Sequence, residues 1–245
     1  MAALCILLLC GLMAALTGVC GVEIIGGQAV PPHSRPYMAY ILLGRGKSSS
    51  CGGFLIREDF VLTAAHCQAQ EYHVIIGAHN IEENETSQKV INVKKAFPHP
   101  LSKNFENDIM LLKLIKPVVL NREVAVIPLR SRSVAPGTVC SVAGWGKVNQ
   151  SKSSSNSILQ EVNVTVQNYE QCRSTWGGQY DDRKICAGRP DHGTCKGDSG
   201  GPLVCDGFAQ GIVSFGSDNC KDKPAIYTKI SVYKYWIKAT LRDPC

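Results

Sequence analysis

Gly193-Thr-Cys-Lys-Gly-Asp-Ser-Gly-Gly-Pro202 is the stretch that decides how this 245-residue chain is interpreted. It contains one hydroxyl nucleophile, Ser199, between glycines that let the backbone turn tightly and bring its N–H groups close to a reacting group. A serine hydroxyl is a weak nucleophile at neutral pH, so the stretch needs a base and an orienting acid from elsewhere in the chain. Both candidates lie upstream: His66 in Val61-Leu-Thr-Ala-Ala-His-Cys67, and Asp108 in Asn107-Asp-Ile-Met-Leu-Leu-Lys113.

The order of these motifs, His then Asp then Ser, separates two classes of serine hydrolase. The chain resembles the chymotrypsin-like serine peptidases, whose three motifs it matches in kind and in order. The segment Gly197-Asp-Ser-Gly-Gly201 also fits the G-x-S-x-G elbow of α/β-hydrolases, in which the histidine follows the serine. All six histidines of this chain precede Ser199. A lipase or esterase of that fold would therefore lack its base.

The N-terminal 16 residues are almost wholly apolar and uncharged, and small residues follow around Cys20. This pattern predicts a secretory signal peptide over residues 1–21. The apolar run is shorter than the roughly 20 residues that a membrane-spanning helix needs, so we expect no membrane anchor. The sequence therefore predicts a secreted protein.

The chain carries 26 basic and 20 acidic residues, which gives a formal net charge of +6. Such a charge favours polyanionic partners, and sulfated glycosaminoglycan is one candidate. Lysines scattered over a solvated surface are the alternative interpretation, and it stays open. No nucleic-acid-binding motif accompanies the charge, so we expect no nucleic-acid partner.

Short β-prone runs separated by turn residues follow one another from residue 37 onward, a spacing that favours antiparallel barrels over βαβ units. With the resemblance, this predicts an all-β, chymotrypsin-like fold of two antiparallel six-stranded β-barrels and a C-terminal helix. Barrel 1 would span about 37–116, a connection 117–136, barrel 2 about 137–229, and the helix about 230–242. The strands are expected at 37–43, 51–56, 60–65, 72–76, 90–93 and 109–114, then at 138–143, 159–166, 184–187, 202–204, 209–215 and 225–230.

The chain has twelve cysteines, three of which would leave with the signal peptide. In a secreted chain the remaining nine indicate disulfides, although their spacing alone does not set the connectivity. The resemblance implies that the odd residue is Cys245, as a free thiol, an intermolecular bridge or a trimmed end. The resemblance implies four bridges: Cys51 to Cys67, Cys140 to Cys205, Cys172 to Cys186, and Cys195 to Cys220.

The segment that follows the leader is Val22-Glu23-Ile24-Ile-Gly-Gly27, and its resemblance to the activation segment of the same peptidases implies a zymogen. The resemblance implies that Ile24 becomes the N-terminus of a mature 24–245 peptidase and that its amino group pairs with Asp198. A buried carboxylate without a partner is costly, so this pairing can act as a switch. Residues 22–23 end in an acidic residue instead of Arg or Lys, which resembles the granzyme and mast-cell protease group. That resemblance implies an activating dipeptidyl peptidase and storage in cytoplasmic secretory granules.

Catalytic roles for the three motif residues are implied by the resemblance. His66 would be the general base, Asp108 would orient the imidazole, and Ser199 would form the acyl-enzyme. The N–H groups of Gly197 and Ser199 would form the oxyanion hole. No cofactor is needed, and no metal is expected because no second ligand cluster with zinc spacing accompanies His66-Cys67. Protein or peptide substrates and serpin-type inhibitors are the implied partners.

The substrate pocket implied by the resemblance is uncharged at its base and walls, which favours cleavage after large apolar residues such as Phe, Tyr, Leu or Met. A buried substrate Lys or Arg would lack a counter-ion there, so trypsin-like specificity is not expected. Thr194 near the pocket base and Lys196 at its rim, with Lys221 and Lys223 close by, keep acidic (Asp) specificity open as an alternative. The expected substrate-binding residues are Gly193, Thr194, Lys196, Ser214, Phe215, Gly216 and Ala225.

Three N-x-S/T sequons, at Asn84, Asn149 and Asn163, predict N-glycosylation. Asn163 lies in a predicted strand and is the weakest of the three sites.

A second class of function also stays open, an inactive homologue that acts as a cationic binding or antimicrobial protein. Such homologues usually lack the histidine or the serine, whereas this chain has both His66 and Ser199.

Overall fold

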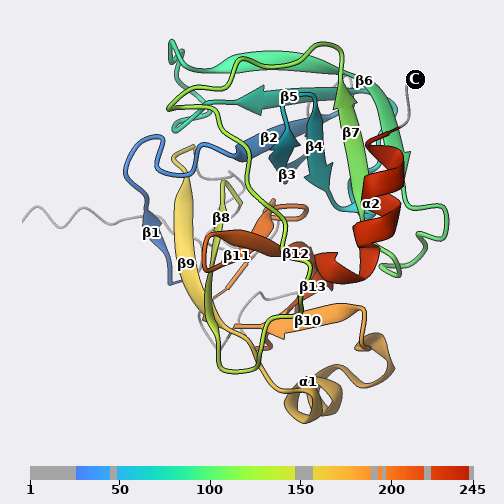
Figure 1. Ribbon diagram of the computed structural model, residues 1–245. Helices are drawn as coiled ribbons and strands as arrows, with labels where there is room; N and C mark the ends of the chain where they lie inside the picture. Colours follow the sequence, from blue (N-terminus) through green and yellow to red (C-terminus); the bar gives the residue numbers. More distant parts are fainter. Residues whose placement is uncertain are drawn as a thin grey trace, which may run out of the picture.

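Two antiparallel sheets stack on each other and form the body of the computed structural model, which describes residues 26–44, 49–146, 157–188, 193–194, 197–217 and 222–242 (Figure 1). The expected signal peptide, Ile24, Asn149, Lys196, Cys195, Cys220 and Cys245 lie outside these residues. None of the helices in the described ranges has the length and apolarity that a membrane crossing requires.

The first sheet is a closed six-stranded barrel in the strand order β2-β3-β4-β7-β6-β5. Side chains on both faces of its strands, such as Ile41 on one face and Phe54, Leu62 and Leu111 on the other, are fully buried. Every strand predicted for barrel 1 is present, because each apolar run has one face to bury against the others. The strands are β2 (Met38–Leu43), β3 (Ser49–Arg57), β4 (Phe60–Thr63), β5 (Tyr72–Ile76), β6 (Lys89–Pro98) and β7 (Met110–Leu114).

The second sheet has seven strands in the order β1-β9-β8-β11-β12-β13-β10. All six predicted strands of barrel 2 are present, and a bridge between Val166 and Ala187 brings the β9 and β10 edges together. The seventh strand, β1, was not predicted because two residues are too few to show a period. The strands are β1 (Gln28–Ala29), β8 (Val139–Gly144), β9 (Gln160–Thr165), β10 (Lys184–Ala187), β11 (Pro202–Cys205), β12 (Phe208–Phe215) and β13 (Ala225–Lys229).

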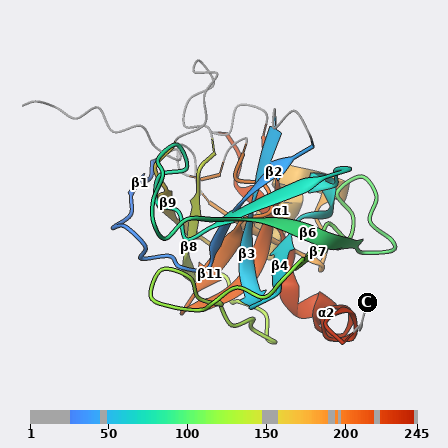
Figure 2. The ribbon, with the colours of Figure 1, turned by 90° about the horizontal axis from the view of Figure 1, so that it is seen from above.

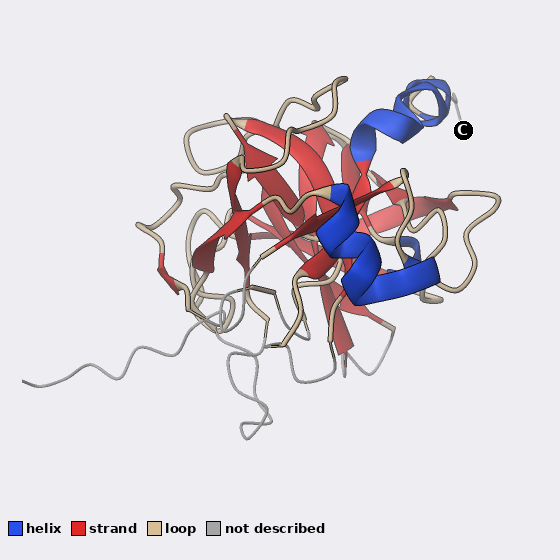
Figure 3. Cartoon of the chain, turned by 90° about the horizontal axis from the view of Figure 1, so that it is seen from below, coloured by secondary structure: helices blue, strands red, loops and turns tan. Residues whose placement is uncertain are grey.

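Helices lie outside the strands (Figure 3). The α1 helix (Tyr169–Trp176), followed by the 3-10 turn η2 (Gly177–Gln179), was not predicted. Its sequence signal is a capping box, in which Asn168 accepts from the Gln171 backbone N–H and the Gln171 side chain accepts in return. Eight residues with a polar surface give little apolar periodicity, so the cap is the only strong local signal.

The C-terminal helix packs on barrel 1 although it follows barrel 2 in the chain (Figure 2). It begins as a 3-10 turn, η3 (Ile230–Tyr233), and continues as α2 (Lys234–Thr240), so the predicted 230–242 helix is shorter and partly 3-10. Three- and four-residue spacing predicts one apolar face, and Tyr233 and Ile237 of that face are indeed buried in the barrel 1 core. The helix therefore ties the two halves of the chain together.

We expect Ile237→Ala to lower the free energy of unfolding by about 2–4 kcal/mol. Ile237 is only 4% exposed, so removing most of its side chain leaves a cavity in the core. Urea denaturation of the folded protein measures this loss. The matched control is Lys238→Ala, next along the same helix and exposed, which should change the value by less than about 0.5 kcal/mol. Equal effects of the two substitutions would contradict the packing of α2 on barrel 1.

Three of the four implied disulfides are present: Cys51–Cys67, Cys140–Cys205 and Cys172–Cys186. The first joins β3 to the turn after β4, the second joins β8 to β11, and the third joins α1 to β10. The expected bridge between Cys195 and Cys220 lies outside the described residues.

Candidate active site

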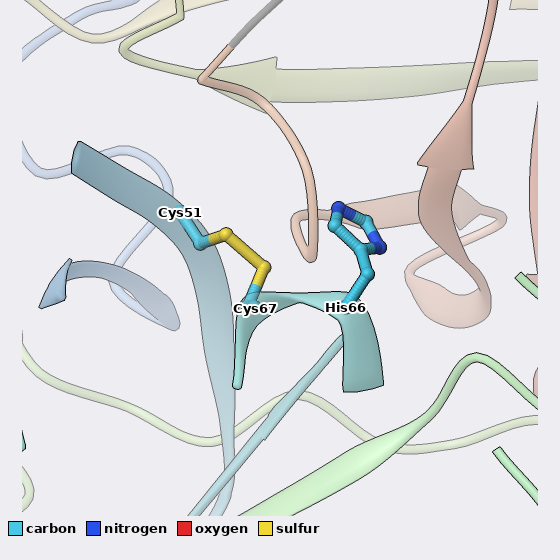
Figure 4. A group of neighbouring side chains, drawn as sticks. All are labelled: Cys51, His66 and Cys67. Atoms are coloured by element: carbon cyan, nitrogen blue, oxygen red, sulfur yellow. A yellow bond between two sulfur atoms is a disulfide. The ribbon is translucent and has the colours of Figure 1, made fainter. Parts of the chain in front are cut away.

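A short 3-10 turn, η1 (Ala65–Cys67), positions His66 at the end of β4. Cys67 is bonded to Cys51 in β3, and the Thr63 hydroxyl donates to the Gly52 carbonyl oxygen over 2.8 Å. The His66 imidazole and the Cys51–Cys67 disulfide project from neighbouring positions of this turn (Figure 4). A covalent bond and a buried hydrogen bond thus fix the backbone on either side of His66, while its side chain stays 25% exposed.

Asp108 comes just before β7, and its carboxylate contacts the Nδ1 side of the His66 ring. Its Oδ2 lies 2.8 Å from His66 Nδ1, and its Oδ1 accepts the His66 backbone N–H over 2.9 Å. The Ser214 hydroxyl donates to the same Oδ2 over 2.5 Å, and the Thr228 hydroxyl donates to the Asp108 carbonyl oxygen over 2.8 Å. Both carboxylate oxygens therefore have donors, although the side chain is only 1% exposed.

Burial and hydrogen bonding act in opposite directions on this carboxyl. Burial raises the pKa of Asp108, but the hydrogen bonds and charge of His66, with the Ser214 hydroxyl, outweigh burial and hold the pKa below its ordinary value. Asp108 is therefore ionised wherever His66 can act as a base. Ser214 was expected as a substrate-binding residue, and its hydrogen bond to Asp108 was not predicted from the sequence.

Ser199 lies in a turn against β3, next to the His66 turn. Its carbonyl oxygen accepts the Gly52 N–H over 2.7 Å and lies 3.8 Å from Cys67 Sγ. The flanking Gly197 and Gly200 have φ values of +103° and +85°, a region in which L side chains are strained. A Cβ added at Gly200 would also lie 2.2 Å from Thr63 Oγ1, so this glycine is required for the close approach.

The Asp198 side chain turns away from Ser199 into the protein and is almost fully buried. Its Oδ1 accepts the Gly146 N–H over 2.9 Å. A Cβ added at Gly144 or at Gly146 would lie within 2.2 to 2.4 Å of that oxygen, so the carboxylate fits between two glycines. Its expected partner, the amino group of Ile24, lies outside the described residues.

The predicted pocket residues are apolar or neutral where the structure describes them. Thr194 and Ala225 are buried, and a Cβ added at Gly216 would lie 3.9 Å from the Cβ of Ala225. Gly216 and Ala225 therefore lie side by side where β12 ends and β13 begins. The fully buried Tyr227 follows on β13, and burial raises the pKa of its hydroxyl, so this side chain carries no charge.

Phe105 is a site residue that sequence analysis missed. Its ring centroid lies 5.2 Å from that of His66 and 5.3 Å from that of Phe215, and Phe215 packs edge-on against Trp176 at 5.3 Å. A hollow of about 120 Å³ beside His66 is lined by Gln68, Ser102 and Phe105, among others. A single aromatic residue in the polar segment 102–107 was the available signal, but its ring contacts, His66 and Phe215, come from two distant parts of the chain.

Cys51, His66 and Cys67 place three potential metal-binding atoms within 4.8 Å of one another. The two sulfur atoms are bonded to each other and so provide no thiolate, which is the form that binds zinc. This group is consequently a structural bridge beside a histidine, and its residues do not fit a metal ion.

The sequence profile of the family described as Trypsin matches residues 24–237. The chain belongs to the trypsin family. Duodenase-1 of Bos taurus is 47% identical over 244 residues, covering 97% of this chain and 96% of the relative. Granzyme B of Homo sapiens is 50% identical over 230 residues (90% and 92%), and cathepsin G of Mus musculus is 45% identical over 234 residues (90% and 86%). Membership of the trypsin family makes the chain a serine endopeptidase by class, and it agrees with the closed barrel and the seven-stranded second sheet described above.

Proposed function

We propose that this protein is a secreted endopeptidase that cleaves peptide bonds through an acyl-enzyme on Ser199. His66 Nε2 accepts the hydroxyl proton as Ser199 Oγ bonds to the scissile carbonyl carbon, and returns it to the leaving amine as the C–N bond breaks. Water then attacks the ester by the same proton path in reverse, releasing the acid and restoring Ser199. The N–H groups of Gly197 and Ser199 stabilise the oxyanion.

The observation that carries this proposal is the fully paired Asp108 carboxylate behind His66. Because an ionised acceptor faces Nδ1, the ring proton stays on Nδ1 and leaves Nε2 free to act as a base. The three residues come from separate segments, and nothing in a purely structural role requires a buried acid to hold an exposed imidazole in one tautomer.

The test is covalent labelling of the processed chain, beginning at Ile24, with a small fluorophosphonate. We expect a single label on the tryptic peptide that contains Ser199, and no label after unfolding in urea. A correctly folded chain that takes no label would support the alternative, a cationic binding or antimicrobial homologue without peptidase activity.

For specificity we propose cleavage after Phe, Tyr, Leu or Met. The described pocket residues, Thr194, Gly216 and Ala225, bring no charge, so an apolar side chain gains most from burial there. Lys223 does not argue for acidic substrates, because its ammonium lies 4.9 Å from the centre of the Trp176 ring. Profiling on peptides that vary only at the cleaved residue tests this, and a dominant cut after Asp would establish the acidic alternative.

We further propose activation by a dipeptidyl peptidase that removes residues 22–23, and storage in secretory granules. The buried Asp198 supports a switch of this kind, since it lies beside both Gly197 and Ser199.

Exposed side chains at Asn84 and Asn163 support glycosylation at those sequons, while Asn149 lies outside the described residues. Sulfated glycosaminoglycan and serpin-type inhibitors remain proposed partners on the basis of charge and of enzyme class.

A further inference from the structure

An ion cluster joins the two sheets at the loop that leads into the active site. Glu106 comes from the loop between β6 and β7, whereas Lys184 begins β10 of the other sheet. Glu106 Oε1 lies 2.5 Å from Lys184 Nζ, and the other carboxylate oxygen accepts from Arg183. Asp181 completes the cluster, 2.6 Å from Arg183 Nη2 and 3.4 Å from Lys184 Nζ.

The cluster is more than a surface ion pair because Lys184 is buried. Its side chain is 5% exposed, compared with 39% for Glu106 and 42% for Arg183. A buried ammonium that loses its close partner is strongly unfavourable, whereas exposed pairs contribute little. Without Glu106, the only carboxylate left near Lys184 among the described residues would be Asp181, at the longer distance. The contact from barrel 1 is therefore the one that Lys184 depends on.

The loop that Glu106 anchors has an unfavourable backbone. Asn104, Phe105 and Asn107 have φ values of +49°, +63° and +48°, and for a bulky residue such as Phe105 this conformation is rare. Strained residues persist only where the surroundings determine their conformation. Within the loop, Lys103 and Glu106 exchange backbone hydrogen bonds of 3.1 and 2.8 Å, so Glu106 lies at the closing end of the turn that carries Phe105.

Two separate contacts reach this loop from the second sheet. The Phe105 ring packs on Phe215, which packs on Trp176 of α1, and the Cys172–Cys186 bridge joins α1 to β10. The ion pair from Glu106 returns to the first residue of β10. Aromatic pairs occur over a range of centroid distances, about 4.5–7 Å, so the ring contacts alone do not fix the position of the loop. The charged contact fixes the distance between the loop and β10, and with it the place of Phe105.

We propose that Glu106 is a positioning residue that holds Phe105 against His66 and so sets selectivity at the substrate position preceding the cleaved residue. This inference rests on the proposed function. In a substrate strand that adds beside Ser214–Gly216, successive side chains point to opposite faces. The side chain before the cleaved residue therefore points away from the Gly216–Ala225 pocket, onto the surface formed by the rings of Phe105, His66 and Phe215. When Glu106 loses its charge, the loop relaxes, the Phe105 wall moves, and a large substrate side chain at this position loses its contact.

The experiment uses Glu106→Gln in the mature protein, with two peptide substrates that differ only in Leu or Gly at the position before the cleaved residue. For the Leu substrate we expect KM to rise about fivefold, with kcat changed less than about twofold. For the Gly substrate we expect KM to stay constant. The matched control is Glu161→Gln, whose bidentate pair with Arg35 lies on β9, and both substrates should keep their constants there.

A double-mutant cycle with Lys184→Met shows whether the ion pair is responsible. If it is, the Leu-substrate KM of the double variant matches that of the worse single variant instead of the product of both effects. Arg183→Gln replaces Lys184→Met if the latter does not fold, since Arg183 is partly exposed.

Three outcomes would overturn the inference: unchanged Leu selectivity in Glu106→Gln, an equal KM rise for both substrates, or a loss confined to kcat. Fluorophosphonate labelling of the wild type separates the two proposals. A wild type that is not labelled refutes the peptidase function itself, whereas normal labelling with unchanged selectivity refutes only the role of Glu106.

Discussion

Asp108→Asn should lower kcat by about 10⁴-fold and leave the fold intact. The reason lies in the two oxygens of the carboxylate. Oδ1 accepts the His66 backbone N–H, so the amide oxygen of an asparagine would take that place. The amide nitrogen would then occupy the Oδ2 position and donate to His66 Nδ1. The ring proton would move to Nε2, which could no longer accept the proton of Ser199.

The measurement is steady-state hydrolysis of a peptide substrate, together with urea denaturation to show that the variant is folded. Asp59→Asn is the matched control, because Asp59 is a partly buried acid paired with Arg57 away from His66, and it should keep kcat. A kcat within tenfold of the wild type for Asp108→Asn would contradict the tautomer argument and, with it, the assignment of His66 as the base.

The pH dependence follows from the lowered pKa of Asp108. A carboxyl whose folded pKa lies below its unfolded value, about 3.9, contributes its full stabilisation above that value and loses it as the pH falls through the folded pKa. Asp108 therefore stays ionised near neutral pH. Any loss of activity between pH 8 and about 5 would arise from another group.

The strands and the site motifs could be predicted from sequence because their signals are local. Apolar runs between turn residues predicted all six strands of barrel 1, and the motifs singled out His66 and Asp108, whose side chains the structure brings to 2.8 Å from each other. The glycines beside Ser199 also have a local reason, since Gly197 and Gly200 adopt positive φ. Each of these features can be predicted from a few consecutive residues.

What the sequence could not predict depends on contacts between distant segments. The Ser214 hydroxyl meets Asp108 across 106 positions, and Glu106 meets Lys184 across 78. Neither pair leaves a pattern in the chain, because a lone Ser or Glu in a polar or β-prone segment has many other uses. Phe105 has the same difficulty, since its importance comes from the rings of His66 and Phe215. Such roles become visible only once the two sheets are packed.

Gly146→Ala is expected to reduce kcat by about 10²- to 10³-fold. The added Cβ would lie 2.4 to 2.6 Å from the Oδ1, Cγ and Oδ2 atoms of Asp198, closer than real Cβ contacts come. The carboxylate belongs to a short side chain of a residue that is only 1% exposed. The backbone at Asp198 must then shift, and Gly197 and Ser199 on either side of it carry the proposed oxyanion donors. Losing one such donor costs about this factor.

Gly178→Ala is the matched control for this prediction, because its added Cβ meets nothing within 4 Å and its φ is not positive. We expect it to keep wild-type kcat, which would show that an extra methyl group is tolerated where there is room. For Gly146→Ala, peptide hydrolysis and fluorophosphonate labelling should fall together, because both need the oxyanion hole. A folded Gly146→Ala enzyme with undiminished kcat would mean that Asp198 can move without disturbing Gly197, and that the proposed activation switch does not act through this carboxylate.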